Sequence, residues 1–222
     1  MKKFELTAET KINVFEKKLF RIKALISFRD VKEGDVGGWI EKEKNLSHSG
    51  NAWVYDNAEV YGNARVYDNA EVCDNAWVYG NAWVYGNARV CDNARVCDNA
   101  EAYGNARVCD NAEVYGNARV SGNARVCDNA EVYGNARVYD NAEVCDNADY
   151  ATIHGFGTKF RTTTFFRCKD KQVRVCCGCF FGTIPEFREQ VKNTRGGRIA
   201  EEYLMIADLM EKHFTEEKEG GE

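Results

Sequence analysis

The sequence predicts a repetitive all-β fold in which short strands alternate with tight corners. The first observation is a period of six. Residues 51–152 of the 222 repeat the unit N-A-x-V-[YC]-[DG], and Asn-Ala returns seventeen times without a break. The second is alternation: Ala and Val stand two apart and share one face of an extended chain, whereas a helical period of 3.6 would scatter them. The third is the Asp-Asn or Gly-Asn step that closes each unit, because Asn and Gly tolerate the positive φ of a corner.

The unit resembles the hexapeptide repeat of left-handed parallel β-helices, in which an aliphatic residue follows a small residue two positions later. The resemblance implies a triangular coil of eighteen residues, so residues eighteen apart should stack in columns. The sequence has such columns, because the residue after Val is Cys at positions 73, 91, 109, 127 and 145 and mostly Tyr on the other two faces. We therefore expect a left-handed parallel β-helix over residues 51–152. Asn ladders and stacked Tyr rings should run along it.

The flanking residues predict two further parts. Residues 1–50 should form an N-terminal β cap and opening coil, with strands at 4–6, 11–14 and 19–28 and a glycine-rich loop at 34–38. Residues 153–222 should form a small C-terminal α+β domain. It would contain a hairpin of 162–167 with 172–176, a helix from a capping box at Thr183 and Glu186 to Thr194, and a second helix after Gly196-Gly197. The tail from Thr215 is expected to be frayed. Both flanks would cover open strand edges of the β-helix.

The whole arrangement resembles hexapeptide-repeat proteins of bacteriophages, prophages and their bacterial hosts, through GDVGGWIEKEKNLS at 34–47 and TTTFFRCKD and CCGCFFGT within 162–183. That resemblance implies a phage or prophage origin but no activity. The β-helix family also contains trimeric acyltransferases that use a histidine. Residues 51–152 contain no histidine, and His48, His154 and His213 lie outside them. We therefore expect no catalytic residue and a protein that is not an enzyme.

Composition limits the partners and the compartment. The formal net charge of −5 argues against general nucleic-acid binding. No apolar run is long enough to span a membrane, and the N-terminus does not resemble a signal peptide. The cytoplasm is the expected location, and there the ten cysteines should be reduced thiols.

The Cys and Asp columns are a candidate cation or disulfide site. We expect instead that these cysteines are small strand residues outside the β-helix interior, with Arg89, Arg107 and Arg125 offsetting the Asp charges on that face. A second group, Cys168, Cys176, Cys177 and Cys179, lacks the paired CxxC spacing of common zinc sites and is predicted to consist of buried strand residues. No metal and no cofactor is predicted.

The basic segment 159–198 is the candidate ligand site, because it holds ten basic and three acidic residues. Arg161 and Arg167 are six apart on one strand and should point to the same face, with Lys159 in phase. Together with Arg174 on the partner strand, they predict a two-pronged anion clamp. The helix N-terminus near Thr183 would add backbone N–H donors.

These features predict a non-enzymatic binding or scaffold protein that presents a rigid β-helix prism and forms a homo-oligomer. A small anionic ligand or a host protein is the expected partner. One alternative is a phage counter-defence protein that sequesters a small anion or nucleotide signal. The other alternative is a degenerate relative of the hexapeptide-repeat acyltransferases.

Overall fold

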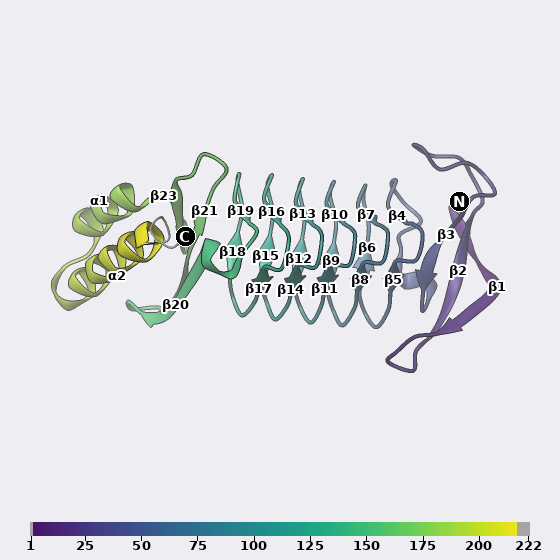
Figure 1. The fold of residues 1–222 in the computed structure, drawn as a ribbon, viewed down its shortest axis with the longest axis horizontal. Coiled ribbons are helices and arrows are strands. Elements are labelled where there is room, and N and C mark those ends of the chain that lie inside the picture. The colour runs from purple at the N-terminus through teal and green to yellow at the C-terminus, as the bar shows by residue number, and fades with distance from the viewer. Residues whose placement is uncertain (1, 217–222) are drawn as a thin grey trace, which may run out of the picture.

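The molecule is an elongated β-helix prism with a strand cap at one end and a small α+β domain at the other (Figure 1). The computed structural model describes residues 2–216, so the part of the predicted frayed tail beyond Glu216 lies outside the described residues. Thr215 and Glu216 still belong to the last helix. Within residues 2–216, neither helix combines the length and apolar composition that crossing a bilayer requires.

Three parallel sheets form the sides of the prism, and the predicted parallel β-helix is confirmed. Pairing follows the eighteen-residue register, as in Arg89 opposite Arg107 and Val90 opposite Val108. One side consists of β4 (Trp53–Val54), β7 (Glu71–Val72), β10 (Arg89–Val90), β13 (Arg107–Val108), β16 (Arg125–Val126) and β19 (Glu143–Val144). The second consists of β6 (Arg65–Val66), β9 (Trp83–Val84), β12 (Glu101–Ala102), β15 (Arg119–Val120) and β18 (Arg137–Val138). The third contains β5 (Glu59–Val60), β8 (Trp77–Val78), β11 (Arg95–Val96), β14 (Glu113–Val114) and β17 (Glu131–Val132).

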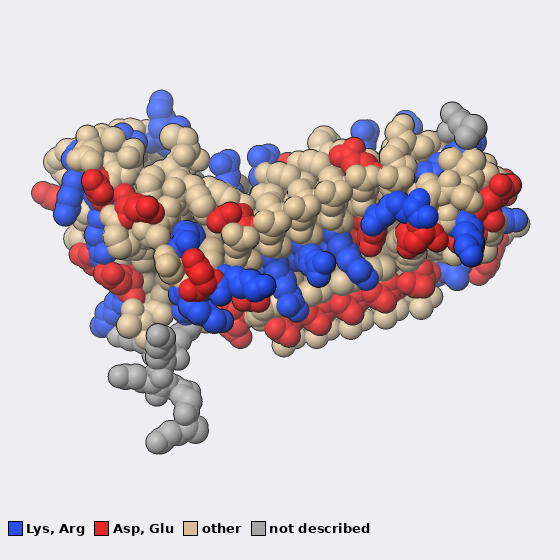
Figure 2. Space-filling view, turned by 90° about the horizontal axis from the view of Figure 1, so that it is seen from above, with Lys and Arg blue, Asp and Glu red and all other residues tan. Residues whose placement is uncertain are grey.

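The interior between the three sheets is filled mainly by alanine and valine side chains. From Ala52 to Val144 the Ala and Val positions of the repeats are buried, with Ala88 and Val90 at 1% and 0% exposure. Their backbones pair with the next coil; the Arg89 N–H, for example, donates to the Ala106 carbonyl at 2.9 Å. The outward position between Ala and Val carries arginines and glutamates, and the corners carry aspartates. Figure 2 shows acidic and basic side chains in parallel rows along the prism.

The corners differ in one respect from the prediction. The residue with positive φ is the Asp or Gly before Asn, with φ between 51° and 63° for the corner aspartates from Asp56 to Asp140. Asp146, at the last corner, is extended instead, with φ of −138°. The Asn side chains instead form the predicted amide ladders. Asn87, for example, donates to Asn105 at 3.1 Å, and Asn105 donates to Asn123 at 2.9 Å. The Asn side-chain amide therefore bonds between coils, while the Asp or Gly before it has the positive φ of the corner.

The N-terminal strands extend the third side of the prism. β1 (Phe4–Ile12) and β2 (Lys18–Ala24) form an antiparallel hairpin, and β2 pairs with β3 (Val36–Ile40), which pairs in parallel with β5. Segments 4–6 and 11–14, predicted as separate strands, therefore belong mostly to one irregular strand. The predicted loop at 34–38 is also partly wrong, because Gly37 and Gly38 lie within β3. A Cβ on Gly38 would lie 2.6 Å from Val54 Cγ1, so the first coil packs directly against this backbone.

The C-terminal sheet is sandwiched between the prism and two helices. It contains β20 (Tyr150–Phe156), β21 (Arg161–Arg167), β22 (Val173–Cys177) and β23 (Phe180–Thr183), followed by α1 (Ile184–Thr194) and α2 (Gly197–Glu216). Side chains alternate along β21: Phe166 packs on the last coil, whereas Phe165 packs on the helices. The Arg137 N–H also donates to Thr164 Oγ1 at 3.1 Å. This sheet therefore closes one end of the prism and supports the helices on its other face.

Candidate functional site

A hollow of about 320 Å³ opens between β21, β22, the loop before β21 and the two helices. Three cationic residues line it: Lys159 and Arg161 come from the loop and the start of β21, and Arg195 follows the end of α1. Its apolar wall is aromatic and consists of Phe180, Phe187 and Tyr203. The packing of α1 and α2 on the sheet thus places a charged rim around an aromatic wall.

The charged side chains that line this hollow are all basic. No carboxylate lines it, and among residues 2–216 no ion pair with an acidic group is found for Lys159, Arg161 or Arg195. Elsewhere in the domain arginines are paired; Arg188, for example, contacts both Asp208 and Glu211 at 2.6 Å. Unpaired cations that share a partly enclosed hollow attract an anionic ligand.

The backbone around Arg161 is adapted to hold its guanidinium. Gly178, in the turn between β22 and β23, has φ of +66°, and a Cβ there would clash with Arg161 Nη1. The guanidinium therefore lies across a turn that only glycine fits without strain. Arg161 also lines a second, more open hollow with Arg137 and His154.

Tyr203 and Cys177 are two further polar residues that line the hollow. The Tyr203 hydroxyl donates to the Phe156 carbonyl at 3.3 Å, and Thr163 Oγ1 donates to Cys177 Sγ at 3.2 Å. Burial, with the nearby Cys177, raises the pKa of Tyr203, and Arg195 and Arg161 oppose this effect only in part. The phenol therefore stays neutral at physiological pH, and the cations set the charge of the site.

The four residues predicted as an anion clamp do not form one site. Lys159 and Arg161 share the hollow, but Arg167 lies at the other end of β21. There its guanidinium bonds Asp149 Oδ1 at 3.1 Å and stacks over Phe214 at 5.3 Å. Arg174 bonds Asp170 at 2.8 Å. Arg161 and Arg167 share a strand face as predicted, but six residues of strand, roughly 20 Å, separate them. The two-pronged clamp is therefore wrong.

The helix N-terminus at Thr183 is also closed to an outside anion. The predicted capping box forms, with the Thr183 N–H donating to Glu186 Oε2 at 2.7 Å. This backbone hydrogen bond, with that of the Thr183 side chain, lowers the pKa of Glu186. The chain thus supplies its own carboxylate at the position predicted to receive a ligand.

Three residues that line the hollow, Arg195, Tyr203 and Cys179, were not predicted as site residues. Arg195 was among the ten basic residues of the segment, and its position just after a predicted helix was the one available signal. Tyr203 lies on the second predicted helix, where it recurs with Ile199, Ile206 and Met210 at a spacing typical of a packed apolar face. The approach of Arg195 and Tyr203 to Arg161 depends on how α1 turns back against the sheet, which no local pattern specifies.

The column cysteines lie outside the Ala and Val interior, as predicted, but several are buried. Cys73, Cys109 and Cys127 are 5%, 9% and 0% exposed, because neighbours in the column cover them. The expectation of uniformly reduced thiols is also wrong, because Cys127 and Cys145 form a disulfide. In the C-terminal group, Cys168 and Cys176 are buried as predicted, whereas Cys177 is half-buried and Cys179 is exposed.

Comparisons with known proteins support the repeat fold. Residues 58–74 and 112–128 match the family described as YdcK β-solenoid repeat. A curated protein of Escherichia coli (strain K12), named "Uncharacterized acetyltransferase YdcK", is 39% identical over 66 residues, covering 25% of this chain and 19% of the relative. The chain thus spans less than a fifth of that relative in the match. The two family-matched segments lie in the prism, and neither includes a residue of the C-terminal hollow.

Proposed function

We propose that this protein is a non-enzymatic binding protein that holds a small organic anion in the C-terminal hollow, on the end of a rigid prism. The observation that carries the proposal is the set of three cations, Lys159, Arg161 and Arg195, which face one hollow without a carboxylate partner among residues 2–216. Such residues remain available for a ligand, whereas ion-paired arginines are already satisfied.

The lining favours an anion with a flat apolar part, such as a nucleotide. A volume of about 320 Å³ lies at the small end of the range for ligand pockets. Phe180 and Phe187 offer ring surfaces, while Gln190 and Thr194 offer hydrogen-bonding side chains. A phosphate would contact the cations, and a base would pack on the aromatic wall.

Calorimetric titration with nucleoside monophosphates and cyclic dinucleotides tests this proposal. The double variant Arg161→Gln/Arg195→Gln should weaken binding by at least about a hundredfold, since each charge-assisted contact contributes about 1.5–3 kcal/mol. Arg174→Gln is the matched control, because Arg174 pairs with Asp170 outside the hollow. Absence of binding to the wild type, or equal weakening in the control, would refute the proposal.

The acyltransferase alternative has one observation in its favour, the 39% identity over 66 residues to the Escherichia coli protein named as an uncharacterized acetyltransferase. The lining of the hollow supports a binding role instead, because it contains no histidine or carboxylate to act as a general base. His154 lies in the neighbouring hollow and contacts Thr162 Oγ1 at 3.2 Å. We expect no transfer from acetyl-coenzyme A to small amines or alcohols. Transfer that His154→Ala abolishes would establish the enzyme alternative.

The phage or prophage origin, the counter-defence role and homo-oligomerisation stay predictions. The first two depend on the resemblance of residues 34–47 and 162–183 to phage-type repeat proteins. Sedimentation of the full chain measures the oligomeric state, and we expect more than one copy per particle. A monomer at all concentrations would contradict that expectation.

A further inference from the structure

The Cys column is a one-dimensional array of thiols with the spacing of a parallel sheet. Cys73, Cys91 and Cys109 each follow a Val that pairs in register with the Val of the next coil. Neighbouring cysteines with the same side-chain rotamer therefore have sulfur atoms one strand spacing apart, about 4.8 Å. The corner residue after each cysteine is an aspartate, so thiols and carboxylates alternate along one edge of the prism.

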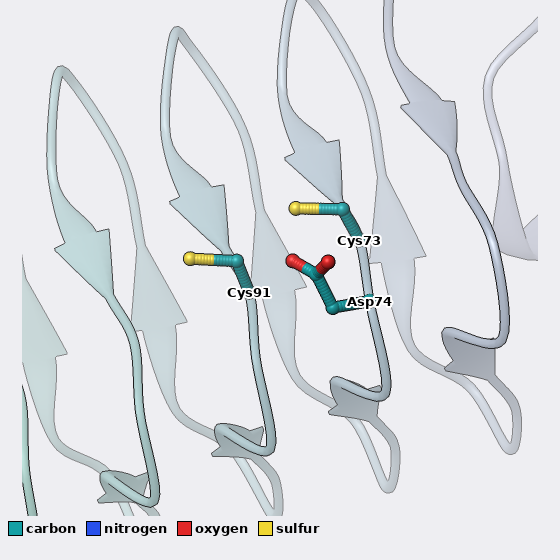
Figure 3. Close-up of side chains that lie close together, drawn as sticks. All are labelled: Cys73, Asp74 and Cys91. Carbon is teal, nitrogen blue, oxygen red and sulfur yellow. The ribbon is translucent and has the colours of Figure 1, made fainter.

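We propose that Cys73, Asp74 and Cys91 bind a thiophilic divalent cation of the Zn²⁺ class. Their two sulfur atoms and a carboxylate oxygen all lie within 4.8 Å of one another. Figure 3 shows the two cysteines on neighbouring coils with the Asp74 carboxylate beside them. Two thiolates and one carboxylate are a ligand set that Zn²⁺ accepts, with water completing a tetrahedron.

The side-chain movement that Zn²⁺ binding requires is small. Two sulfur atoms that share a tetrahedral Zn²⁺ at about 2.3 Å lie roughly 3.8 Å apart, so the thiols must approach by about 1 Å. Rotation about the Cα–Cβ bonds supplies such a shift without moving the backbone ladder. The charges also balance: the three ligands carry −3 and the cation +2. Arg89 lies on the same outward face as Cys91, two residues before it, and offsets the remainder.

This position is favoured over the rest of the column. Cys127 and Cys145 form the equivalent arrangement with Asp128, but their sulfur atoms are joined in the disulfide. The third arrangement, Asp92 with Cys109 and Asp110, offers a single thiol. Cys97 holds the same repeat position on another face, where Tyr79 and Tyr115 are its column neighbours. It therefore has no second thiol in its column and serves as a matched control.

Titration of the full chain with Co²⁺, followed by Zn²⁺ displacement, tests the proposal. Without reductant, the wild type should bind one more equivalent of Co²⁺ than Cys73→Ser/Cys91→Ser. It should also show a thiolate-to-metal charge-transfer band that this variant lacks. Cys97→Ser should bind as much Co²⁺ as the wild type and show the same band. Serine already stands in this repeat position at Ser121, where it is 8% exposed, so these variants should fold. Circular dichroism checks that they do.

The disulfide provides an internal check of the same geometry. Reduction should free the Cys127 and Cys145 thiols, and the reduced chain should bind one further equivalent of Co²⁺. Cys127→Ser should lose only this additional equivalent. Equal uptake by the wild type and Cys73→Ser/Cys91→Ser would overturn the proposal. So would the loss of the band in Cys97→Ser, because the isolated thiol would then account for the binding.

Discussion

Aspartate at the corners of the prism has an unfavourable positive φ, but its carboxylate can accept a backbone hydrogen bond. A non-glycine residue at φ near +60° costs roughly 1 kcal/mol relative to glycine. In the Cys column, however, the Asp92 carboxylate accepts the Asp110 backbone N–H at 3.3 Å, and Asp74 does the same for Asp92. The carboxylates therefore link successive corners, and the like charges one strand apart oppose this gain.

Asp92→Asn should separate these effects. Asparagine tolerates the left-handed angle and retains an oxygen to accept the Asp110 N–H, but it removes a charge that lies between Asp74 and Asp110. We expect about 0.5–1 kcal/mol of added stability in urea unfolding at low salt, and a smaller gain at high salt. Asp92→Ala, which also loses the acceptor, should be less stable than the wild type. A destabilised asparagine variant would show that repulsion in the column is negligible.

Residue-level prediction succeeded where a position depends only on its register. The Cys and Tyr columns, the Asn ladders and the outward Arg positions all follow from counting eighteen residues, and the structure has them. Burial of Cys127 was missed because its cover comes from neighbouring coils rather than from the interior. The disulfide was missed because equal spacing does not say which thiols pair.

At the scale of the element, columns of stacked Tyr rings run along two sides of the prism. The Tyr67, Tyr85 and Tyr103 rings stack at 4.8 and 4.9 Å, and Tyr61 stacks on Tyr79 at 5.1 Å. Burial is the main cause that raises the pKa of Tyr61, Tyr79 and Tyr85 above the ordinary value. Each phenol thus loses its proton more readily in the unfolded chain.

The sign of the resulting pH dependence follows from these shifts. Below a pH of about 10, the unfolded tyrosines keep their protons and the stabilisation is complete. Above it, the unfolded chain releases protons that the folded chain retains, so stability falls as pH rises. We expect phenol absorbance near 295 nm to rise together with the loss of β-sheet signal. Ionisation well before unfolding would contradict the expectation.

Tyr61→Phe is the matched variant for this alkaline transition. The Tyr61 side chain is 4% exposed, and its hydroxyl has no hydrogen-bond partner among the described residues. Phenylalanine preserves the stack and removes one group that titrates, so the midpoint of alkaline unfolding should move to higher pH. At pH 7 the variant should be as stable as the wild type or slightly more stable.

The C-terminal elements illustrate the limit of local prediction. The hairpin of β21 and β22 and the capped start of α1 follow from short patterns, and both are present. The hollow requires Arg195 to approach Arg161, and this depends on the angle at which α1 and α2 pack against Phe165. Sequence spacing carries no information about that angle, so the prediction joined Arg161 and Arg167, which the structure holds apart, and left out Arg195.

At the scale of the whole molecule, stability should be close to a sum over neighbouring coils, because each coil pairs only with the next. The flanks close the two ends: β3 pairs with β5 at one end, and Phe166 of β21 packs on the last coil at the other. The N-terminal cap reaches no further than the second coil in its ring contacts and ion pairs, for example through Phe15 on Tyr79 and Arg29 with Glu71. The number of coils between the two flanks is therefore free to change, provided that the register of eighteen is kept.

Two nested deletions test this register. Removing residues 105–122 joins equivalent corners, so Cys127 stacks on Cys91 and Tyr139 stacks on Tyr103, and the shortened prism should fold with one nearest-neighbour unit less. Removing 105–123 takes out one more residue, Asn123, and leaves a corner too short to close. Every downstream Val must then turn outward, or one coil must strain. We expect a much lower urea midpoint for the longer deletion, although it differs by a single residue. Equal midpoints for the two deletions would show that the coils tolerate a loss of register, and the stacked columns would not be the basis of the fold.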